Sequence, residues 1–147
     1  MLLAETAKLR SDCLGRHVGA VIIRDDRIIS TGYNGTPIGT ANCSAGGCYR
    51  CSHKTQYAPG VGYDQCVCVH AEQNAILAAA RFGQSVLGGK LYTTLKPCFG
   101  CLKEALQAGV VEIYYREDWQ LPEAYPGDDL IQQYQMIQAC FAAFAAI

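Results

Sequence analysis

Two short motifs contain residue types that could form a metal-dependent active site. His70 and Glu72 lie two positions apart in the stretch CVCVHAEQNAILAAA (residues 66–80), and Cys98 and Cys101 lie three positions apart in KPCFGC. Both pairs stand at the start of a run with helical spacing. Cysteines three positions apart share a helix face, and in a first turn thiol pKa values fall and thiolates bind metal. The partial positive charge of the helix start also favours a carboxylate there.

This donor set predicts a catalytic metal site. A structural zinc normally has four protein ligands, whereas a catalytic zinc keeps one position for water. His70, Cys98 and Cys101 supply three ligands, which leaves Glu72 outside the shell. Zinc with two thiolates and a neutral imidazole has no net charge, so it activates water less than zinc with three imidazoles. We therefore predict that Glu72 takes a proton from the water and returns it to the substrate, as hydrolytic deamination requires.

Each motif alone has a simpler interpretation. His-x-Glu is common at solvated helix starts, and Cys-x-x-Cys also occurs in redox pairs and structural zinc sites. Together they match the H-x-E...P-C-x-x-C pattern of zinc-dependent nucleobase deaminases. A non-catalytic zinc-binding module is the alternative from a different functional class.

Size and charge narrow the range of partners. The chain has 147 residues, half of them hydrophobic and 17% charged, which is typical of one globular domain. A net charge of -1 without a cluster of Lys and Arg argues against nucleic acid as a partner. No leader is visible at Met1 and no apolar run approaches the roughly 20 residues of a membrane span. We expect a cytoplasmic protein that does not bind membranes, located in the host cytoplasm if the chain is viral.

Nine cysteines are many for this length, and the number is odd. They stand at positions 13, 43, 48, 51, 66, 68, 98, 101 and 140. Clustered Cys-x-x-Cys spacings without a secretory signal favour metal binding over the alternative, a disulfide framework.

The elements that position these motifs alternate between helix and strand. The patterns predict a helix at 2–10, a hairpin of strands 18–24 and 27–33, a helix at 70–82, a strand at 90–95, a helix at 98–108 and a strand at 110–115. Apolar residues 130, 134, 137, 141 and 144 predict that the chain ends in an amphipathic helix. These elements indicate an α/β layer sandwich. Residues 34–69 show no periodicity, so something other than an apolar core must hold that loop.

From about residue 9 to 115 the chain resembles the cytidine deaminase superfamily, and most closely the deoxycytidylate (dCMP) deaminases. The resemblance rests on RSDCLGRHVGAVI, RIISTGYNGTPIG, CVHAEQNAI and LYTTLKPCFGCLKEALQAGV. It implies a three-layer α/β/α sandwich with a central mixed sheet, and hydrolysis of dCMP to dUMP and ammonia in pyrimidine nucleotide biosynthesis. The implied site residues are zinc ligands His70, Cys98 and Cys101, proton shuttle Glu72, Asn34 at the sugar and the Ala71 backbone at the base.

The resemblance also suggests a purpose for the Cys-rich loop, at about 36–69. Related phage and fungal proteins place cysteines or other metal ligands in comparable positions, and GGCYRCSH adds further donors. A second, closed zinc would order a loop that has little apolar content. The favoured ligands are Cys13, Cys43, Cys51 and Cys68, and the alternative is a set of free, reduced cysteines. Cys140 is expected to pack in the core of the last helix.

Related enzymes are often homohexamers, activated by dCTP and inhibited by dTTP with Mg²⁺. The segment GYNG, which comprises Gly32, Tyr33, Asn34 and Gly35, is associated with that regulatory nucleotide. The same residues are equally suited to a turn after a strand. The family more often ends with a further strand, so the resemblance is weakest in the last thirty or so residues.

Other deaminases are alternatives. A tRNA adenosine deaminase shares the zinc set but would be expected to carry a basic surface, and free cytidine deaminases usually have cysteine where this chain has His70. For the 5'-phosphate the candidates by residue type are Arg10, Arg16 and Lys96. Trp119 and Tyr125 are equal candidates for covering the base.

Overall fold

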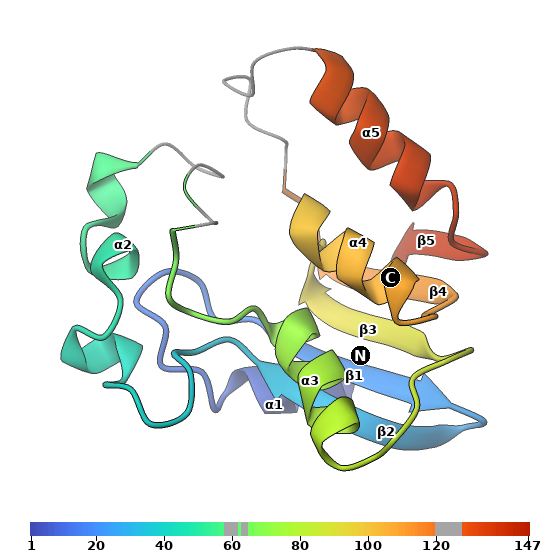
Figure 1. Cartoon of the computed structure of the whole chain (residues 1–147), viewed down its shortest axis with the longest axis horizontal. Helices are drawn as coiled ribbons and strands as arrows, with labels where there is room; N and C mark the ends of the chain where they lie inside the picture. Colours follow the sequence, from blue (N-terminus) through green and yellow to red (C-terminus); the bar gives the residue numbers. More distant parts are fainter. Residues whose placement is uncertain (58–61, 63–64, 120–127) are drawn as a thin grey trace.

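A mixed β-sheet with helices on both faces forms the centre of the protein (Figure 1). The computed structural model describes residues 1–57, 62, 65–119 and 128–147. The described strands are β1 (Gly19–Arg24), β2 (Arg27–Tyr33), β3 (Lys90–Leu95), β4 (Glu112–Glu117) and β5 (Ala143–Ala146), in the order β2-β1-β3-β4-β5. β1 runs antiparallel to β2 and β3, whereas β3, β4 and β5 are parallel. The expected three-layer α/β/α sandwich with a mixed sheet is confirmed.

The predicted hairpin has a two-residue turn. Asp25 and Asp26 have φ values of 51° and 59°. Positive φ at both central residues gives a turn whose twist matches that of the strands, and aspartate tolerates this conformation better than most residues. The turn places Ala20 opposite Gly32 in the ladder, so both face the same side of the sheet.

Two glycines let helices approach the sheet closely from opposite sides. A Cβ on Gly19 would overlap the backbone of Ala4 in α1 (Leu2–Lys8). A Cβ on Gly32 would overlap the backbone of Ala71 in α3 (Ala71–Arg81). Because α3 lies directly on the hairpin, its first turn is fixed against β2. In Figure 1, α1 lies behind the sheet and α3 in front of it.

Helix α4 (Phe99–Gln107) lies beside α3 on the same face (Figure 1). The main core lies between these two helices and the sheet; its fully buried members include Ala20, Ile22, Ala75, Leu91, Leu102, Ala105 and Ile113. Gly83 and Gly109 follow the two helices with φ values of 69° and 86°, the left-handed conformation that commonly ends a helix. No helix within the described residues combines the length and the apolarity that a bilayer crossing demands.

The predicted C-terminal helix is wrong for the last residues. Helix α5 (Asp128–Gln138) stops at Gln138, and the chain then forms β5 parallel to β4. Phe144 keeps a near-helical spacing in the sequence, yet it lies in this strand with its ring 5.3 Å from that of Tyr115. Pairing with the open edge of β4 and packing between aromatic rings outweigh the local pattern. Cys140 is exposed rather than part of the core, and its thiol donates to the carbonyl of Met136.

Short helical turns interrupt the Cys-rich loop, for which no secondary structure was predicted. They are η1 (Cys43–Ala45), α2 (Tyr49–Ser52) and η2 (Lys54–Gln56). Residues 58–61 and 63–64 of this loop lie outside the described part of the chain. In Figure 1 the segment with α2 stands beside the start of α3 rather than over the sheet. It therefore borders the end of the sandwich where His70 lies.

Candidate active site

Three metal-ligand side chains from two helix starts meet at one point. The Nδ1 atom of His70 lies 3.4 Å from the sulfur of Cys98 and 3.4 Å from the sulfur of Cys101. These donor atoms all lie within 4.8 Å of one another. In tetrahedral zinc with ordinary bond lengths, nitrogen and sulfur ligands are about 3.6 Å apart. The donor types and their separations therefore fit one zinc ion.

Two of the three potential metal ligands, His70 and Cys98, are N-cap residues of helices. His70 is the N-cap of α3 in an extended conformation, and its backbone N–H donates to the Gln73 side chain at 2.9 Å. Cys98 is the N-cap of α4 and follows Pro97. The Gln73 amide also donates to Glu104 of α4 at 2.9 Å. One side chain thus caps α3 and ties it to α4, which sets the distance between the two motifs.

The thiols of Cys98 and Cys101 have shifted pKa values of opposite direction. A hydrogen bond from Cys101 lowers the pKa of Cys98 to about 4. The same hydrogen bond and burial raise the pKa of Cys101. Burial acts to lower the pKa of His70, but the hydrogen bond and charge of Cys98 raise it overall. Cys98 is therefore ready as a thiolate, and Cys101 holds the proton that a metal ion would displace.

Glu72 lies in the first turn of α3 and is 4% exposed. The Thr93 hydroxyl lies 3.5 Å from the Oε1 of Glu72 but closer, at 3.1 Å, to the Leu95 carbonyl, and the Oε2 of Glu72 accepts a hydrogen bond from the Cys101 thiol at 3.7 Å. Burial raises the pKa of Glu72 to about 7. Among the described residues, the compact ligand group contains His70, Cys98 and Cys101 without Glu72. The carboxylate is thus beside the metal ligands and able to exchange a proton near neutral pH.

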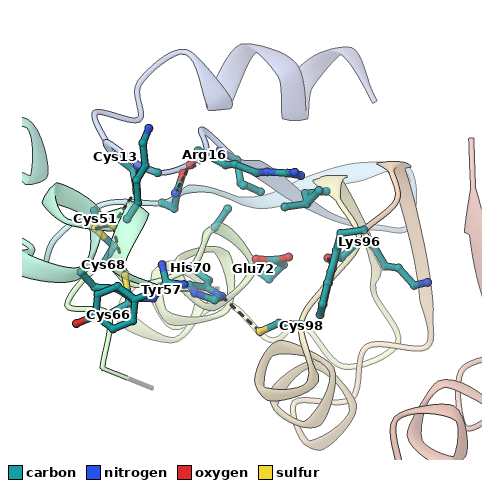
Figure 2. Close-up of a pocket in the computed structure, with 18 of the residues that line it drawn as sticks. Cys13, Arg16, Cys51, Tyr57, Cys66, Cys68, His70, Glu72, Lys96 and Cys98 are labelled. Atoms are coloured by element: carbon teal, nitrogen blue, oxygen red, sulfur yellow. Dashed lines mark hydrogen bonds between the residues drawn. The ribbon is translucent and has the colours of Figure 1, made fainter. Parts of the chain in front are cut away.

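A cavity of about 740 Å³ opens over these residues, within the usual size range of small-molecule sites. His70, Ala71, Glu72 and Cys98 line it. Figure 2 shows Glu72 and His70 on the inner wall, with Arg16 and Lys96 on other walls. Among the described lining residues, Arg16, Arg50, Lys54 and Lys96 are cationic, and Asp118 is acidic. The cavity therefore combines a buried carboxylate and metal donors with a cationic lining.

Asn34 lines the cavity, but most of the hydrogen-bonding groups of its side-chain amide are bonded to other parts of the protein. Its Oδ1 accepts hydrogen bonds from the Ser11 hydroxyl and the Val18 N–H, both at 2.8 Å, and its Nδ2 donates to the Arg16 carbonyl at 2.7 Å. One Nδ2 hydrogen has no bond among these contacts. Ala71 lines the cavity at the start of α3 and is fully buried. Both residues predicted to contact substrate thus border the same space.

The other GYNG residues are not among the described residues that line this cavity. Gly32 packs under α3, and Gly35 forms a β-bridge with Val69. The guanidinium of Arg10 lies over the ring of Tyr33, at 5.5 Å from the ring centroid. Arg10 therefore packs on that ring and is not among the described residues that line the cavity.

Two cationic cavity residues, Arg50 and Lys54, extend the set found from sequence. Arg50 and Lys54 come from the Cys-rich loop, where no periodicity indicated which residues face inward. Trp119 lines the cavity, and its indole N–H donates to the Lys96 carbonyl at 2.6 Å. Tyr125, the other candidate for covering the base, lies outside the described residues.

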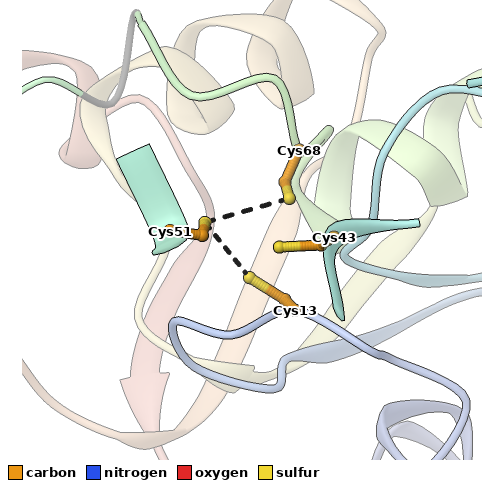
Figure 3. A group of neighbouring side chains, drawn as sticks. All are labelled: Cys13, Cys43, Cys51 and Cys68. Atoms are coloured by element: carbon orange, nitrogen blue, oxygen red, sulfur yellow. Dashed lines mark hydrogen bonds between the residues drawn. The ribbon is translucent and has the colours of Figure 1, made fainter. Parts of the chain in front are cut away.

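A second group of donors lies next to this cavity. The sulfurs of Cys13, Cys43, Cys51 and Cys68 are all within 4.8 Å of one another, and all four residues are buried (Figure 3). The four side chains favoured as ligands of a second zinc therefore meet. They come from the segment after α1, from η1, from α2 and from the strand-like segment before His70.

Comparison with known proteins agrees with this geometry. The family described as "Cytidine and deoxycytidylate deaminase zinc-binding region" matches residues 1–117. The chain is 41% identical over 123 residues to a deoxycytidylate deaminase of Schizosaccharomyces pombe, covering 82% of this chain and 37% of that protein. It is 38% identical over 122 residues to the deoxycytidylate deaminase of Mycobacterium phage D29, covering 79% of this chain and 90% of that protein.

Among solved structures, the dCMP deaminase of cyanophage S-TIM5 in complex with dCMP and dUMP matches with a TM-score of 0.72 and 29% identity. The match covers 98% of this chain and 91% of that one. The chain spans little more than a third of the yeast relative, and most of the phage ones. On the match over residues 1–117, the chain belongs to the cytidine and deoxycytidylate deaminase zinc-binding family.

Proposed function

We propose that residues 1–147 are one zinc-dependent deaminase domain that hydrolyses dCMP to dUMP and ammonia. One observation carries the proposal. The buried carboxylate of Glu72 lies against Cys101, inside the same cavity as His70 and Cys98 but outside their ligand group. This is the arrangement that a hydrolytic deamination needs, with three zinc ligands and a separate proton carrier.

The roles of the residues follow from their positions. His70, Cys98 and Cys101 would hold the zinc, which when bound activates a water molecule for attack on the ring carbon that bears the amino group. Glu72 accepts a proton from that water and passes it to the substrate, so that the amino group leaves as ammonia. The Thr93 hydroxyl and the Cys101 thiol lie on either side of this carboxylate, 3.5 Å and 3.7 Å from its two oxygens.

The cationic lining supports a nucleotide over a nucleoside. Arg16, Arg50, Lys54 and Lys96 line the cavity, although the whole chain has a net charge of -1. Lys96 is already paired with Asp118 at 3.0 Å, and Lys54 donates to the Leu14 carbonyl at 3.0 Å. We assign the contact with the 5'-phosphate first to Arg16, whose guanidinium matches phosphate geometry. The solved cyanophage relative binds dCMP and dUMP.

Cys13, Cys43, Cys51 and Cys68 are proposed to hold a second, structural zinc. Their four buried sulfurs lie within 4.8 Å of one another, and four cysteines are the ligand number of a closed zinc site. The ion would join segments that the sheet does not hold together, and Cys68 is two residues from His70. It would therefore fix the approach of the chain to the active site.

Regulation and assembly stay predictions from the family resemblance. They comprise activation by dCTP, inhibition by dTTP with Mg²⁺, a homohexamer, and a regulatory nucleotide at Gly32, Tyr33, Asn34 and Gly35. Gly32 and Gly35 also have structural roles, because one admits α3 and the other pairs with Val69.

A substrate panel tests the proposed function. We expect ammonia release from dCMP to exceed that from CMP, deoxycytidine and dCTP, and we propose repeating each assay with added dCTP and dTTP. The phosphate on dCMP should lower KM relative to deoxycytidine because Arg16 can form charge-assisted hydrogen bonds. Equal or faster deamination of deoxycytidine would contradict the nucleotide assignment.

A further inference from the structure

The second sulfur cluster contains six cysteines rather than four. One group of potential ligands is Cys13, Cys43, Cys51 and Cys68, and a second is Cys48, Cys51, Cys66 and Cys68. In both groups the sulfurs lie within 4.8 Å of one another. Cys51 and Cys68 belong to both. Two overlapping tetrads that share one pair of sulfurs are the donor arrangement of two metal ions with two bridging thiolates.

The sulfur separations fit two tetrahedra that share an edge. With zinc–sulfur bonds of about 2.3 Å, the edge of a tetrahedron of sulfurs is about 3.8 Å. The potential shared edge, Cys51 to Cys68, measures 3.9 Å. Cys51 lies 3.6 Å from Cys13 in one tetrad and 3.6 Å from Cys66 in the other. Cys48 and Cys66, the two residues found only in the second tetrad, are 3.6 Å apart.

Burial places Cys48 and Cys66 within the cysteine cluster. Cys48 is fully buried, and Cys66 is partly buried against the same group. This satellite cluster consists, among the described residues, of cysteines without a single aliphatic or aromatic side chain. Six small thiols provide little apolar surface to order a loop of this length. Metal–sulfur bonds to all six residues would supply the missing connections.

Charge does not oppose a second ion. One Zn²⁺ with four thiolates has a net charge of -2, and two Zn²⁺ with six thiolates have the same net charge. Cys48 and Cys66 bind as thiolates, so two further sulfurs balance the charge of the second ion within the cluster. Backbone N–H groups of Leu14 and Gly15 donate to the sulfurs of Cys43 and Cys13 at 3.3 and 3.4 Å, which stabilises them as thiolates.

We propose that these six cysteines bind two zinc ions in a binuclear cluster. Cys51 and Cys68 bridge the ions. Cys13 and Cys43 complete the shell of one ion, and Cys48 and Cys66 complete the shell of the other. Zinc and sulfur keep their oxidation states, and the only products of binding are the displaced thiol protons.

The cluster would act as a wall of the active-site cavity. Cys13, Cys51, Cys66 and Cys68 all line that cavity, and Figure 2 shows their side chains beside Tyr57 and His70. The bridging position of Cys68 would fix the backbone two residues before His70. The second ion would add Cys48, the N-cap of α2, and Cys66 to the segments that the first ion holds through Cys51 and Cys68.

Metal counting and X-ray absorption test the binuclear cluster in the purified chain of 147 residues. By native mass spectrometry we expect three zinc ions per chain, one at His70 and two in the cluster. The zinc-edge spectrum should contain a zinc–zinc distance of about 3 Å, as expected for tetrahedra that share an edge. The double variant Cys48→Ser/Cys66→Ser should bind two ions and lose the zinc–zinc signal. The matched control Cys140→Ser changes an exposed cysteine outside the cluster and should keep all three ions.

Two zinc ions in the wild-type chain without a zinc–zinc signal would overturn the proposal, as would a disulfide between Cys48 and Cys66 in reduced, zinc-loaded protein. If the double variant does not fold, the wild-type spectrum alone decides. The result is independent of the proposed deaminase activity. His70→Ala should lose one ion and turnover but keep the zinc–zinc signal, so failure of the cluster and failure of the catalytic site give different outcomes.

Discussion

The Oε2 atom of Glu72 lies 3.7 Å from the sulfur of Cys101, although the two residues are 29 positions apart in the chain. The contact exists because α3 and α4 begin side by side on one face of the sheet. Gln73 links the start of α3 to the middle of α4 by accepting from the His70 N–H and donating to Glu104. The proton carrier and the metal ligands therefore share one support.

The variant Gln73→Ala tests whether the hydrogen bonds of Gln73 hold the starts of the site in place. The substitution removes the acceptor of the His70 N–H and the link to Glu104, so we expect the free energy of unfolding to fall by about 1 kcal/mol. Zinc affinity should also decrease, because the cap positions the His70 backbone. Gln73→Glu is the matched variant: it keeps an acceptor for the cap but places a carboxylate against Glu104. Denaturant unfolding and zinc titration should rank the wild type first, and equal values for all three proteins would contradict this role.

Asn34→Ala should destabilise the segment that precedes β1. The change leaves the Val18 N–H and the Arg16 carbonyl without this partner, whereas the Ser11 hydroxyl keeps the backbone carbonyl of residue 34 at 2.8 Å. Each buried group left without a hydrogen bond costs about 1–3 kcal/mol. We expect a larger loss than for Ser11→Ala, which removes the hydroxyl contact with Asn34 and a longer contact, 3.3 Å, with the Cys13 N–H. Similar unfolding free energies for the two variants would show that Asn34 does not hold this segment.

Arg16→Ala should raise the KM for dCMP about tenfold, because it removes a charge-assisted hydrogen bond to the phosphate. Its effect on deoxycytidine, which has no phosphate, should be small. Arg10→Ala is the control, since Arg10 lies against Tyr33 outside the cavity lining. Steady-state kinetics with both substrates separates the two cases. A KM for dCMP unchanged by Arg16→Ala would remove Arg16 from the phosphate site.

Thiol alkylation should distinguish Cys140 from the other cysteines. In the zinc-loaded protein we expect modification of Cys140 alone, because it is exposed whereas the other eight belong to the two metal-binding groups. After removal of zinc in denaturant, all nine should react. Mass spectrometry of the intact chain counts the added groups. Modification of the Cys-rich loop at the rate of Cys140 in the loaded protein would show that its thiols are not metal ligands.

Local sequence signals were sufficient for most of the fold and for the candidate metal centre. His70 and Cys98 are helix caps, so their positions follow from a short stretch of chain that ends one extended segment and starts a helix. The hairpin follows from Asp25 and Asp26 between β-branched runs. In each case the residues that determine the conformation are neighbours in sequence.

Features that depend on distant contacts were not predictable in this way. Phe144 continues a helical spacing, but the open edge of β4 and the ring of Tyr115 make its segment a strand. Arg50 and Lys54 of the Cys-rich loop line the cavity, and nothing in their local sequence indicates that direction. The sharing of Cys51 and Cys68 between two tetrads likewise appears only in three dimensions.

Turnover and zinc content of Glu72→Gln test the central claim most directly. Glutamine keeps the size of the buried side chain but cannot accept and return a proton, and such proton transfers contribute about a hundredfold to ten-thousandfold to a rate. We predict that the variant keeps the same number of zinc ions as the wild type while ammonia release from dCMP falls by about a thousandfold. Near-normal turnover, or the loss of one zinc ion, would contradict the assignment of Glu72 as a proton carrier outside the metal shell.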